Sequence, residues 1–445
     1  MTEADRLKDE LIAAIRSVER RKHHFCRNPA KDFTRDRKQT MGETILALLS
    51  MTGGTLQREL YKYAAAGNAE ISSSAFCQNR AKIKPESFHE VFRVFNARCA
   101  EKDAKTYRGC HLYAVDGSCI NMARNPDSPC FVSYESNPRG YCQFHLNAWF
   151  DLENKSYFDA LLQPQPRADE RAALMDMIAR NRFVGKNILT LDRGYESYLV
   201  FYTILAKENL EFVCRIKDRK GCMKPLKDWP MAELDRDVEV IITTSQKEYR
   251  EHKDEGYVLI QTRKHEGRRR YSAKTRNGRW PFEEPYTLKF RIVRFLLPTG
   301  QYETVATSLD RSFSVDDLRT IYARRWGVES SFRALKYMVN LTNLHGRSDD
   351  FVYQEIYAAL TAYNFASRVV NAVVVEQKLE RSYMYQVNFT MAVYLCREFL
   401  RQPRGSGEAL LERIRKYIEP IRPGRADKRK IRPKSFVAFN YRVAA

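Results

Sequence analysis

Two aspartates lie where a carboxylate can do chemistry. Asp116 lies within an apolar run that includes Ala114 and Val115, and a buried carboxylate is costly unless it is paired or binds a metal. Asp192 ends the buried-type strand 187–192, and open α/β sheets bind their ligands at the carboxyl ends of strands. An aspartate at a strand end also often caps the next turn. Asp192 alone therefore leaves a functional and a capping role equally open.

A third acid lies on a predicted helix that begins near Ser314. At 100° per residue, four of its side chains share one face within roughly 60°: Tyr322, Arg325, Glu329 and Lys336. Such a face is often a solvated row of ion pairs. Phe332 and Leu335 place apolar surface beside it, so we do not expect the face to be wholly exposed. Two strand carboxylates and one helix carboxylate form an oxygen-only cluster that suits Mg²⁺.

The elements that must position these acids form an α/β pattern. Three β-type runs come first, and two further strands then alternate with two helices. The strands are expected at 111–120, 143–152, 156–164, 187–192 and 211–218, and the helices at 169–181 and 197–209. This order predicts an α/β fold whose mixed sheet is flanked by helices.

Residues 1–107 read as helical. A short helix capped by Ser74 carries Arg80 and Lys82, and an amphipathic helix follows from Pro85. This pair resembles a helix-turn-helix element, which places one helix in a DNA groove. A purely structural helical hairpin is at least as good an interpretation of the same pattern.

The rest of the chain adds strands, helices and basic segments. Short strands are expected within 218–312, where the run 263–280 combines eight basic residues with two aromatics and suits either a DNA backbone or a solvated hairpin loop. Ser314 and Asp317 match a capping box. The run 352–377 is apolar nearly all round, which predicts a buried helix, and 420–436 looks like an extended basic arm.

Composition narrows the class of protein. The 445 residues suggest two or three domains. Lys and Arg number 76 against 55 Asp and Glu, a formal net charge of +21 that attracts polyanions such as nucleic acid, although it can also simply favour solubility. No run reaches the ~18 apolar residues of a membrane helix.

The cysteines do not form a recognisable metal site. Cys130, Cys142 and His145 lack a fourth zinc ligand, so we expect reduced thiols and a cytoplasmic protein.

The helix face and both aspartate motifs resemble one known family. The spacing of Tyr322, Arg325, Glu329 and Lys336 resembles the signature of the insertion-sequence-four family of DD(E) transposases, a bacterial group with an RNase H-like core. AVDG at 114–117 and LDRGY at 191–195 resemble its two aspartate strands. The runs 74–88 and 432–442 are also family-like, so the resemblance covers nearly the whole chain.

The resemblance implies a domain order, a site and partners. The expected parts are a helical DNA-binding domain (1–107), an RNase H-like core (108–217 and 313–345), a β-rich insertion (218–312) and a helical C-terminal region with a basic tail (346–445). Asp116, Asp192 and Glu329 become catalytic ligands of two Mg²⁺ ions, with Mn²⁺ able to substitute. The expected DNA contacts are Tyr322, Arg325, Lys336, Arg80, Lys82 and Arg193.

The implied function is cut-and-paste DNA transposition. The protein would bind the terminal inverted repeats and the target DNA as a homodimer in a synaptic complex, at the bacterial nucleoid in the cytoplasm and without a membrane. A DNA hairpin is a candidate intermediate, and Trp280 and Tyr302 are candidates for stacking a flipped base. Two alternatives are a hydrolytic RNase H-like nuclease and a catalytically inactive remnant that binds DNA as a repressor.

Overall fold

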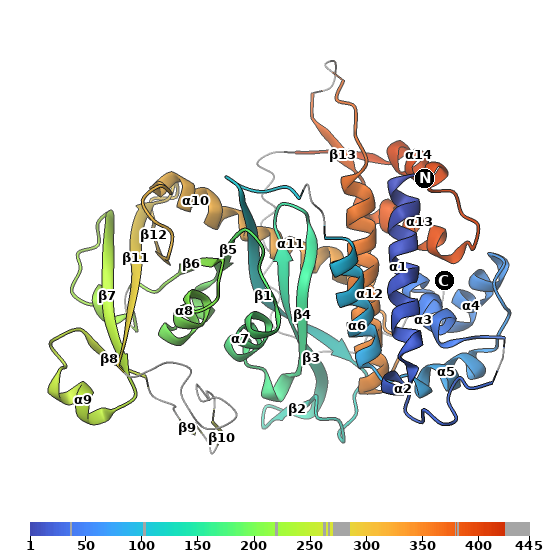
Figure 1. The fold of residues 1–445 in the computed structure, drawn as a ribbon, viewed down its shortest axis with the longest axis horizontal. Helices are drawn as coiled ribbons and strands as arrows, with labels where there is room; N and C mark the ends of the chain where they lie inside the picture. The colour runs from blue at the N-terminus through green and yellow to red at the C-terminus, as the bar shows by residue number, and fades with distance from the viewer. Residues whose placement is uncertain are drawn as a thin grey trace.

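One large mixed sheet organises the protein. The computed structural model describes residues 1–422 except 36–37, 101–103, 219–220, 261–263, 266–267, 270–284, 379 and 381. Within these residues ten strands form a single sheet, in the order β2-β3-β1-β5-β6-β12-β11-β7-β8, with β4 paired to β3. Figure 1 shows the sheet running from β8 at one end of the molecule to a group of helices at the other. The expected mixed α/β fold is confirmed.

The first half of the sheet is built around β1 (Cys110–Met122). β1 pairs antiparallel with β3 on one side and parallel with β5 on the other, and β5 pairs parallel with β6. The bounds are β2 Phe131–Tyr134, β3 Asn137–Asp151, β4 Ser156–Pro164, β5 Lys186–Leu191 and β6 Leu210–Arg215. All five strands expected in this region are present, and the apolar β5 is buried, as a strand inside a sheet requires.

The strands expected within 218–312 continue the same sheet. β12 (Tyr302–Thr307) pairs antiparallel with β6, and β11 (Tyr286–Leu296) joins β12 to β7 (Leu234–Thr243). β8 (Tyr257–Leu259) closes this edge, after the short helix α9 (Gln246–Glu251). Of the basic run 263–280, the structure describes only the backbone of the two-residue strands β9 (Lys264–His265) and β10 (Arg268–Arg269). Trp280 lies outside the described residues.

Helices cover both faces of the sheet, which explains its two hydrophobic cores. On one face α7 (Glu170–Arg180) packs against β1, β3 and β4, and α8 (Tyr198–Leu205) packs against β6, which buries residues such as Met177 and Phe201. The other face packs against α10 (Val315–Arg324), α11 (Trp326–Arg333) and α12 (Asp349–Asn371). None of the helices within the described ranges combines the length and apolarity needed to cross a membrane.

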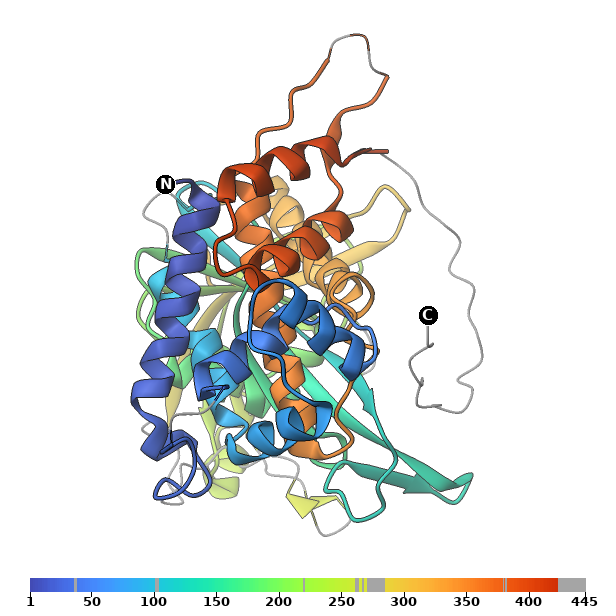
Figure 2. The same ribbon diagram turned by 90° about the vertical axis from the view of Figure 1, so that its right-hand side faces the viewer.

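The helices before and after the sheet share one core. α12 packs against α1, α3, α6 and α13, and α13 also packs against α3 and α14 (Figure 2). The remaining bounds are α1 Glu3–Arg20, α2 Lys22–Phe25, α3 Met41–Ser50, α4 Leu56–Ala65, α5 Ser73–Lys82, α6 Glu86–Arg98, α13 Phe389–Arg401, α14 Gly407–Lys416, β13 Tyr385–Val387 and β14 Ile418–Pro420. The N-terminal helices and the C-terminal helices are therefore packed together in space.

Helix starts follow the local sequence closely. Ser314 caps α10 in a capping box with Asp317, as expected. The buried helix expected at 352–377 is confirmed as α12, which begins at Asp349 and ends at Asn371. The predicted cap of α5 was wrong: the helix begins two residues earlier because Ser72, not Ser74, accepts a hydrogen bond from the backbone N–H of Ala75.

Candidate active site

Asp116 and Asp192 follow paired positions on neighbouring parallel strands. The register places Val115 opposite Leu191, so the next residue on each chain is an aspartate. Parallel strands lie about 4.8 Å apart, which brings the two carboxylates to the same end of the sheet. Asp192 Oδ1 also accepts a hydrogen bond from the Gly194 N–H (2.7 Å), so Asp192 caps the turn as well.

The pKa of the Asp116 carboxyl is raised to about 6. Burial is the main cause, and the negative charges of Asp192 and Glu170 add to it. The Gly117 N–H, which donates to Asp116 Oδ1 (2.8 Å), and the Arg325 guanidinium act in the opposite direction. Asp116 is therefore a half-buried carboxylate with acidic neighbours, a situation that a cation relieves.

Arg325 connects Asp116 to the third acid. Its Nη2 donates to Glu329 Oε1 (2.9 Å), and its Nη1 lies 3.6 Å from Asp116 Oδ2. The Arg325 side chain is only 7% exposed, so this charge is held within the fold. α11 packs against β1, and this packing places Glu329 on the Asp116 side of the sheet. The structure thus brings together Asp116, Arg325 and Glu329, with Asp192 beside them.

The first turn of α11 lies close to Leu152 at Gly327. A Cβ at this position would lie 2.8 Å from Cδ2 of Leu152, at the end of β3. Only a glycine lets the first turn of α11 lie this near the sheet without moving Leu152. The same turn carries Arg325 and Glu329, so the contact helps to fix the site.

The predicted helix is interrupted twice. α10 ends at Arg324, Arg325 keeps a helical conformation between α10 and α11, and residues Ala334–Met338 form a π-helical turn. The Val339 N–H donates to the Ala334 carbonyl (3.0 Å), which is the wider π spacing. Because Lys336 lies inside this turn, its direction differs from the one that 100° per residue predicts.

Tyr322 and Lys336 flank the acids. Tyr322 is buried (4% exposed), with its ring 5.7 Å from the Arg325 guanidinium carbon. Lys336 is half-buried, and burial lowers its pKa although the Cys119 thiol on β1 acts in the opposite direction. The Tyr322 ring therefore lies against Arg325, and Lys336 lies near Cys119, three residues after Asp116 on β1.

Sequence reasoning missed a polar cluster beside Asp116. His145 on β3 lies 3.0 Å from Glu170 Oε1 through Nε2 and 3.8 Å from Cys119 Sγ through Nδ1. Burial favours the neutral ring, but the contacts with Cys119 and Glu170 outweigh it and raise the pKa of His145 to about 9. A Cβ on Gly117 would lie 2.3 Å from Glu170 Oε1, so this cluster lies directly against the Asp116 strand. The only sequence feature that pointed to this cluster was the pair of acidic residues, 169–170, at the start of the helix after β4.

The other expected DNA contacts lie in different surroundings. Arg193 is exposed and directly follows Asp192. Lys82 is half-buried on α5 and donates to Asn79 Oδ1 (2.8 Å). Arg80 lies in the interior, where it pairs with Glu355 (2.8 Å) and donates to Gln354 Oε1 (2.6 Å). The Arg80 guanidinium is therefore occupied by protein groups.

Exposed aromatic side chains lie on the helix that carries Glu329. Trp326 is 57% exposed, and the Arg325 guanidinium carbon lies 5.3 Å from its ring centre. Tyr337 in the π turn is 70% exposed, whereas Tyr302, a candidate from the sequence, is half-buried at the start of β12. An exposed tryptophan one turn before Glu329 offers a stacking surface next to the acids.

Comparison with known proteins places these residues within a recognised domain. A family model described as "Transposase DDE domain" matches residues 111–365, more than half of the chain, and this range contains Asp116, Asp192 and Glu329. A protein of Geobacillus stearothermophilus, "Probable transposase for insertion sequence element IS5377", is 34% identical over 77 residues. That alignment spans 17% of this chain and a fifth (20%) of the relative's length.

A solved structure shows a distant likeness over most of the chain. The cryo-EM structure of the piggyBac transposase synaptic complex with hairpin DNA aligns with a TM-score of 0.43 and 11% sequence identity. The alignment covers 94% of this chain and 84% of the piggyBac chain. A likeness at this level has no bearing on function.

Proposed function

Because the chain belongs to the transposase DDE domain family, we propose that it is a DNA transposase whose active centre consists of Asp116, Asp192 and Glu329. The observation that carries this proposal is the placement of Arg325 between Asp116 and Glu329, with Asp192 at the adjacent strand end. Three segments far apart in the chain thus bring three carboxylates and a buried cation together near the carboxyl end of β5. A structural role alone does not require this convergence.

The proposal extends to the type of fold. Three antiparallel strands followed by two parallel strands, in the order β4-β3-β1-β5-β6, match the arrangement expected of an RNase H-like core. β7, β8, β11 and β12 would then be the insertion between the second and third acids. The motif spacing on α10, α11 and the π turn favours the insertion-sequence-four group within the wider family.

The donor chemistry of the three acids fits a hard divalent cation. The raised pKa of Asp116, caused by burial and by acidic neighbours, means that a nearby cation would favour its ionised form. Among the described residues, no three acidic, histidine or cysteine side chains enclose a point that could hold a metal ion. The positive charge beside Asp116 and Glu329 comes from Arg325. Glu329 would therefore have to break its ion pair with Arg325 in order to bind a metal ion.

Asp116, Asp192 and Glu329 would hold the two Mg²⁺ ions that the family resemblance implies, with Mn²⁺ able to substitute. When bound, these ions would activate an oxygen nucleophile and stabilise the leaving oxygen. In the first step a water oxygen forms a bond to a phosphorus at the end of the element, and the P–O3′ bond breaks to give a 3′-hydroxyl. In the second step that hydroxyl attacks a target phosphodiester and displaces another 3′-oxygen.

The basic residues around the acids would hold the DNA. Once released from Glu329, Arg325 presents a planar fork that matches a phosphate, and Lys336 and Arg193 add charge on either side. Trp326 offers an aromatic face for a base displaced from the duplex. A hairpin intermediate remains part of this proposal by family resemblance alone.

The decisive experiment is a cleavage assay with the purified protein, Mg²⁺ and labelled duplexes made from the DNA that flanks its own gene. Glu329→Gln should retain DNA binding and lose cleavage, whereas the exposed control Glu412→Gln should behave as wild type. Joining of the freed 3′ end to a second duplex separates a transposase from a hydrolytic nuclease. DNA binding without cleavage in the wild type, with Mg²⁺ and with Mn²⁺, contradicts the proposal and favours the repressor alternative.

A further inference from the structure

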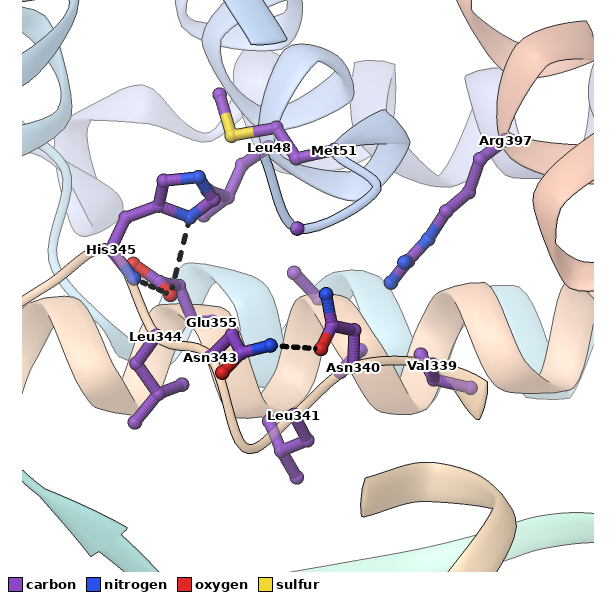
Figure 3. Close-up of a pocket in the computed structure, with 13 residues that line it drawn as sticks. Leu48, Met51, Val339, Asn340, Leu341, Asn343, Leu344, His345, Glu355 and Arg397 are labelled. Carbon is purple, nitrogen blue, oxygen red and sulfur yellow. Dashed lines mark hydrogen bonds and ion pairs between the residues drawn. The ribbon is translucent and has the colours of Figure 1, made fainter. Parts of the chain in front are cut away.

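A small cavity lies behind the π turn, on the side away from the sheet. Its walls come from α3, the loop after the π turn, α12 and α13, and its volume is about 40 Å³ (Figure 3). A buried water needs roughly 10–15 Å³ of such space, so the cavity has room for about three waters or one small oxyanion. None of the three proposed catalytic acids lines it.

Arg397 on α13 points into this cavity without a partner. Its side chain is 6% exposed, and Nε has no hydrogen-bond acceptor. Over the part of the chain that the structure describes, Arg397 makes no hydrogen bond or ion pair, and Figure 3 shows its guanidinium directed toward Asn340. Burial of an unpaired guanidinium is costly, so this charge calls for an anion.

The carboxylate whose charge acts on Arg397, that of Glu59, is already bound by other groups. Glu59 pairs with Arg401 and accepts hydrogen bonds from the backbone N–H groups of Thr52 (3.0 Å) and Gly54 (2.7 Å). Burial lowers the pKa of Arg397 to about 10, and the charge of Arg401 contributes, although Glu59 acts in the opposite direction. Arg401 pairs with Glu398 (2.5 Å) as well as with Glu59, and within the described residues neither carboxylate forms an ion pair with Arg397.

The other acidic group in the wall is neutralised in the same way. Glu355 pairs with Arg80 and accepts hydrogen bonds from the backbone N–H groups of His345 (2.6 Å) and Gly346 (2.7 Å). Gly53 and Asn340 also line the cavity and are in close contact, since a Cβ on Gly53 would lie 1.5 Å from Asn340 Nδ2. The carboxylates of Glu59 and Glu355 are therefore both bound by other groups, and the Arg397 guanidinium has no hydrogen-bonded anion among the described residues.

We propose that this cavity binds a phosphate-type oxyanion through the guanidinium of Arg397. A planar guanidinium fork donates two parallel hydrogen bonds to two oxygens of such an anion. The oxyanion comes either from free inorganic phosphate or from a backbone phosphate of bound DNA. The proposal stands apart from catalysis, because it needs neither the three acids nor transposition.

Thermal unfolding of the full chain with increasing inorganic phosphate, at constant ionic strength set by chloride, tests the site. Wild type should gain about 1–3 °C in a saturable manner. Arg397→Met should lose this response and still fold, because an apolar side chain suits the buried position. The exposed control Arg404→Gln should keep the response. An equal response in wild type and Arg397→Met overturns the proposal.

Two further measurements test the proposal even if Arg397→Met fails to fold. Ala358→Val leaves the charge in place and fills the cavity from α12, so it should also abolish the saturable response. Calorimetric titration of wild type with phosphate should show one saturable site, and its absence overturns the proposal. Repeating the titration on DNA-bound protein identifies the source: loss of the response supports a DNA phosphate in the cavity, and persistence supports free phosphate.

Discussion

Arg325 donates a hydrogen bond to Glu329 across one turn of helix, at 2.9 Å, while its other terminal nitrogen lies 3.6 Å from Asp116. One buried guanidinium therefore compensates two acids from segments that are far apart in the chain. If these acids bind divalent cations, Arg325 and the metal compete for Glu329.

Divalent cations should stabilise the protein in the absence of DNA. Mg²⁺ or Mn²⁺ added to EDTA-treated protein should raise its Tm by about 1–3 °C, because a ligand that binds only the folded state adds to stability. Asp192→Asn should lose this increase, whereas Asp176→Asn, an exposed change on α7, should keep it. An increase of the same size in Asp192→Asn contradicts the assignment of Asp192 as a ligand.

Stability should fall at alkaline pH because of His145. The folded-state pKa of His145 is raised to about 9, above the ordinary value of 6.5, so the protonated ring is favoured by folding. This contribution is fully present below pH 6.5 and is lost as the pH rises through 9. Urea unfolding across this window should show a loss of about 1–3 kcal/mol.

The matched control for His145 is an exposed histidine in a similar pair. His145→Gln should remove most of the pH dependence between 6.5 and 9. His252→Gln, which breaks the exposed contact of His252 with Glu255, should leave that dependence unchanged. If the free energy of unfolding changes with pH equally in wild type and in His145→Gln, other groups cause the pH dependence.

Much of the site was accessible from sequence because it depends on local patterns. The apolar run around Asp116, the strand that ends at Asp192 and the capping box at Ser314 each predict an element and its direction, and the structure confirms these elements. The ion pair of Arg80 with Glu355 was not accessible, because a helix pattern on α5 carries no information about a partner on α12. For the same reason, the sequence alone suggested Arg80 as a DNA contact and not as the partner of Glu355.

Other features of the site could not be predicted, because the spacing of apolar residues in the sequence does not determine them. The π turn at Ala334–Met338 adds a residue to one helical turn, so Lys336 could be placed on the helix but not oriented. His145 was first grouped with Cys130 and Cys142 by spacing, yet its neighbours in the fold are Cys119 and Glu170. Strand pairing decides these neighbours, and it is a long-range property.

Substitution of Arg80 should reduce stability far more than substitution of Lys82. Arg80→Met leaves Glu355 buried without its cation and should reduce the free energy of unfolding by about 3–5 kcal/mol. Lys82→Gln changes a half-buried contact with Asn79 and should cost less than about 1 kcal/mol. Urea unfolding measures both changes. A stable Arg80→Met protein with weakened DNA binding would instead support a direct DNA contact by Arg80.

Trp326 should matter for cleavage more than for stability. Its ring is 57% exposed, so Trp326→Ala removes little buried surface and should leave the Tm within about 2 °C of wild type. Loss of a stacking surface for one base is worth about 1–3 kcal/mol, so cleavage of duplex ends should slow by roughly 5- to 150-fold. Trp326→Phe keeps an aromatic face and should recover most of the rate, while Tyr134→Ala, an exposed aromatic on β2, serves as the control. Single-turnover cleavage rates of the four proteins decide the matter, and an unchanged rate in Trp326→Ala excludes stacking on this ring.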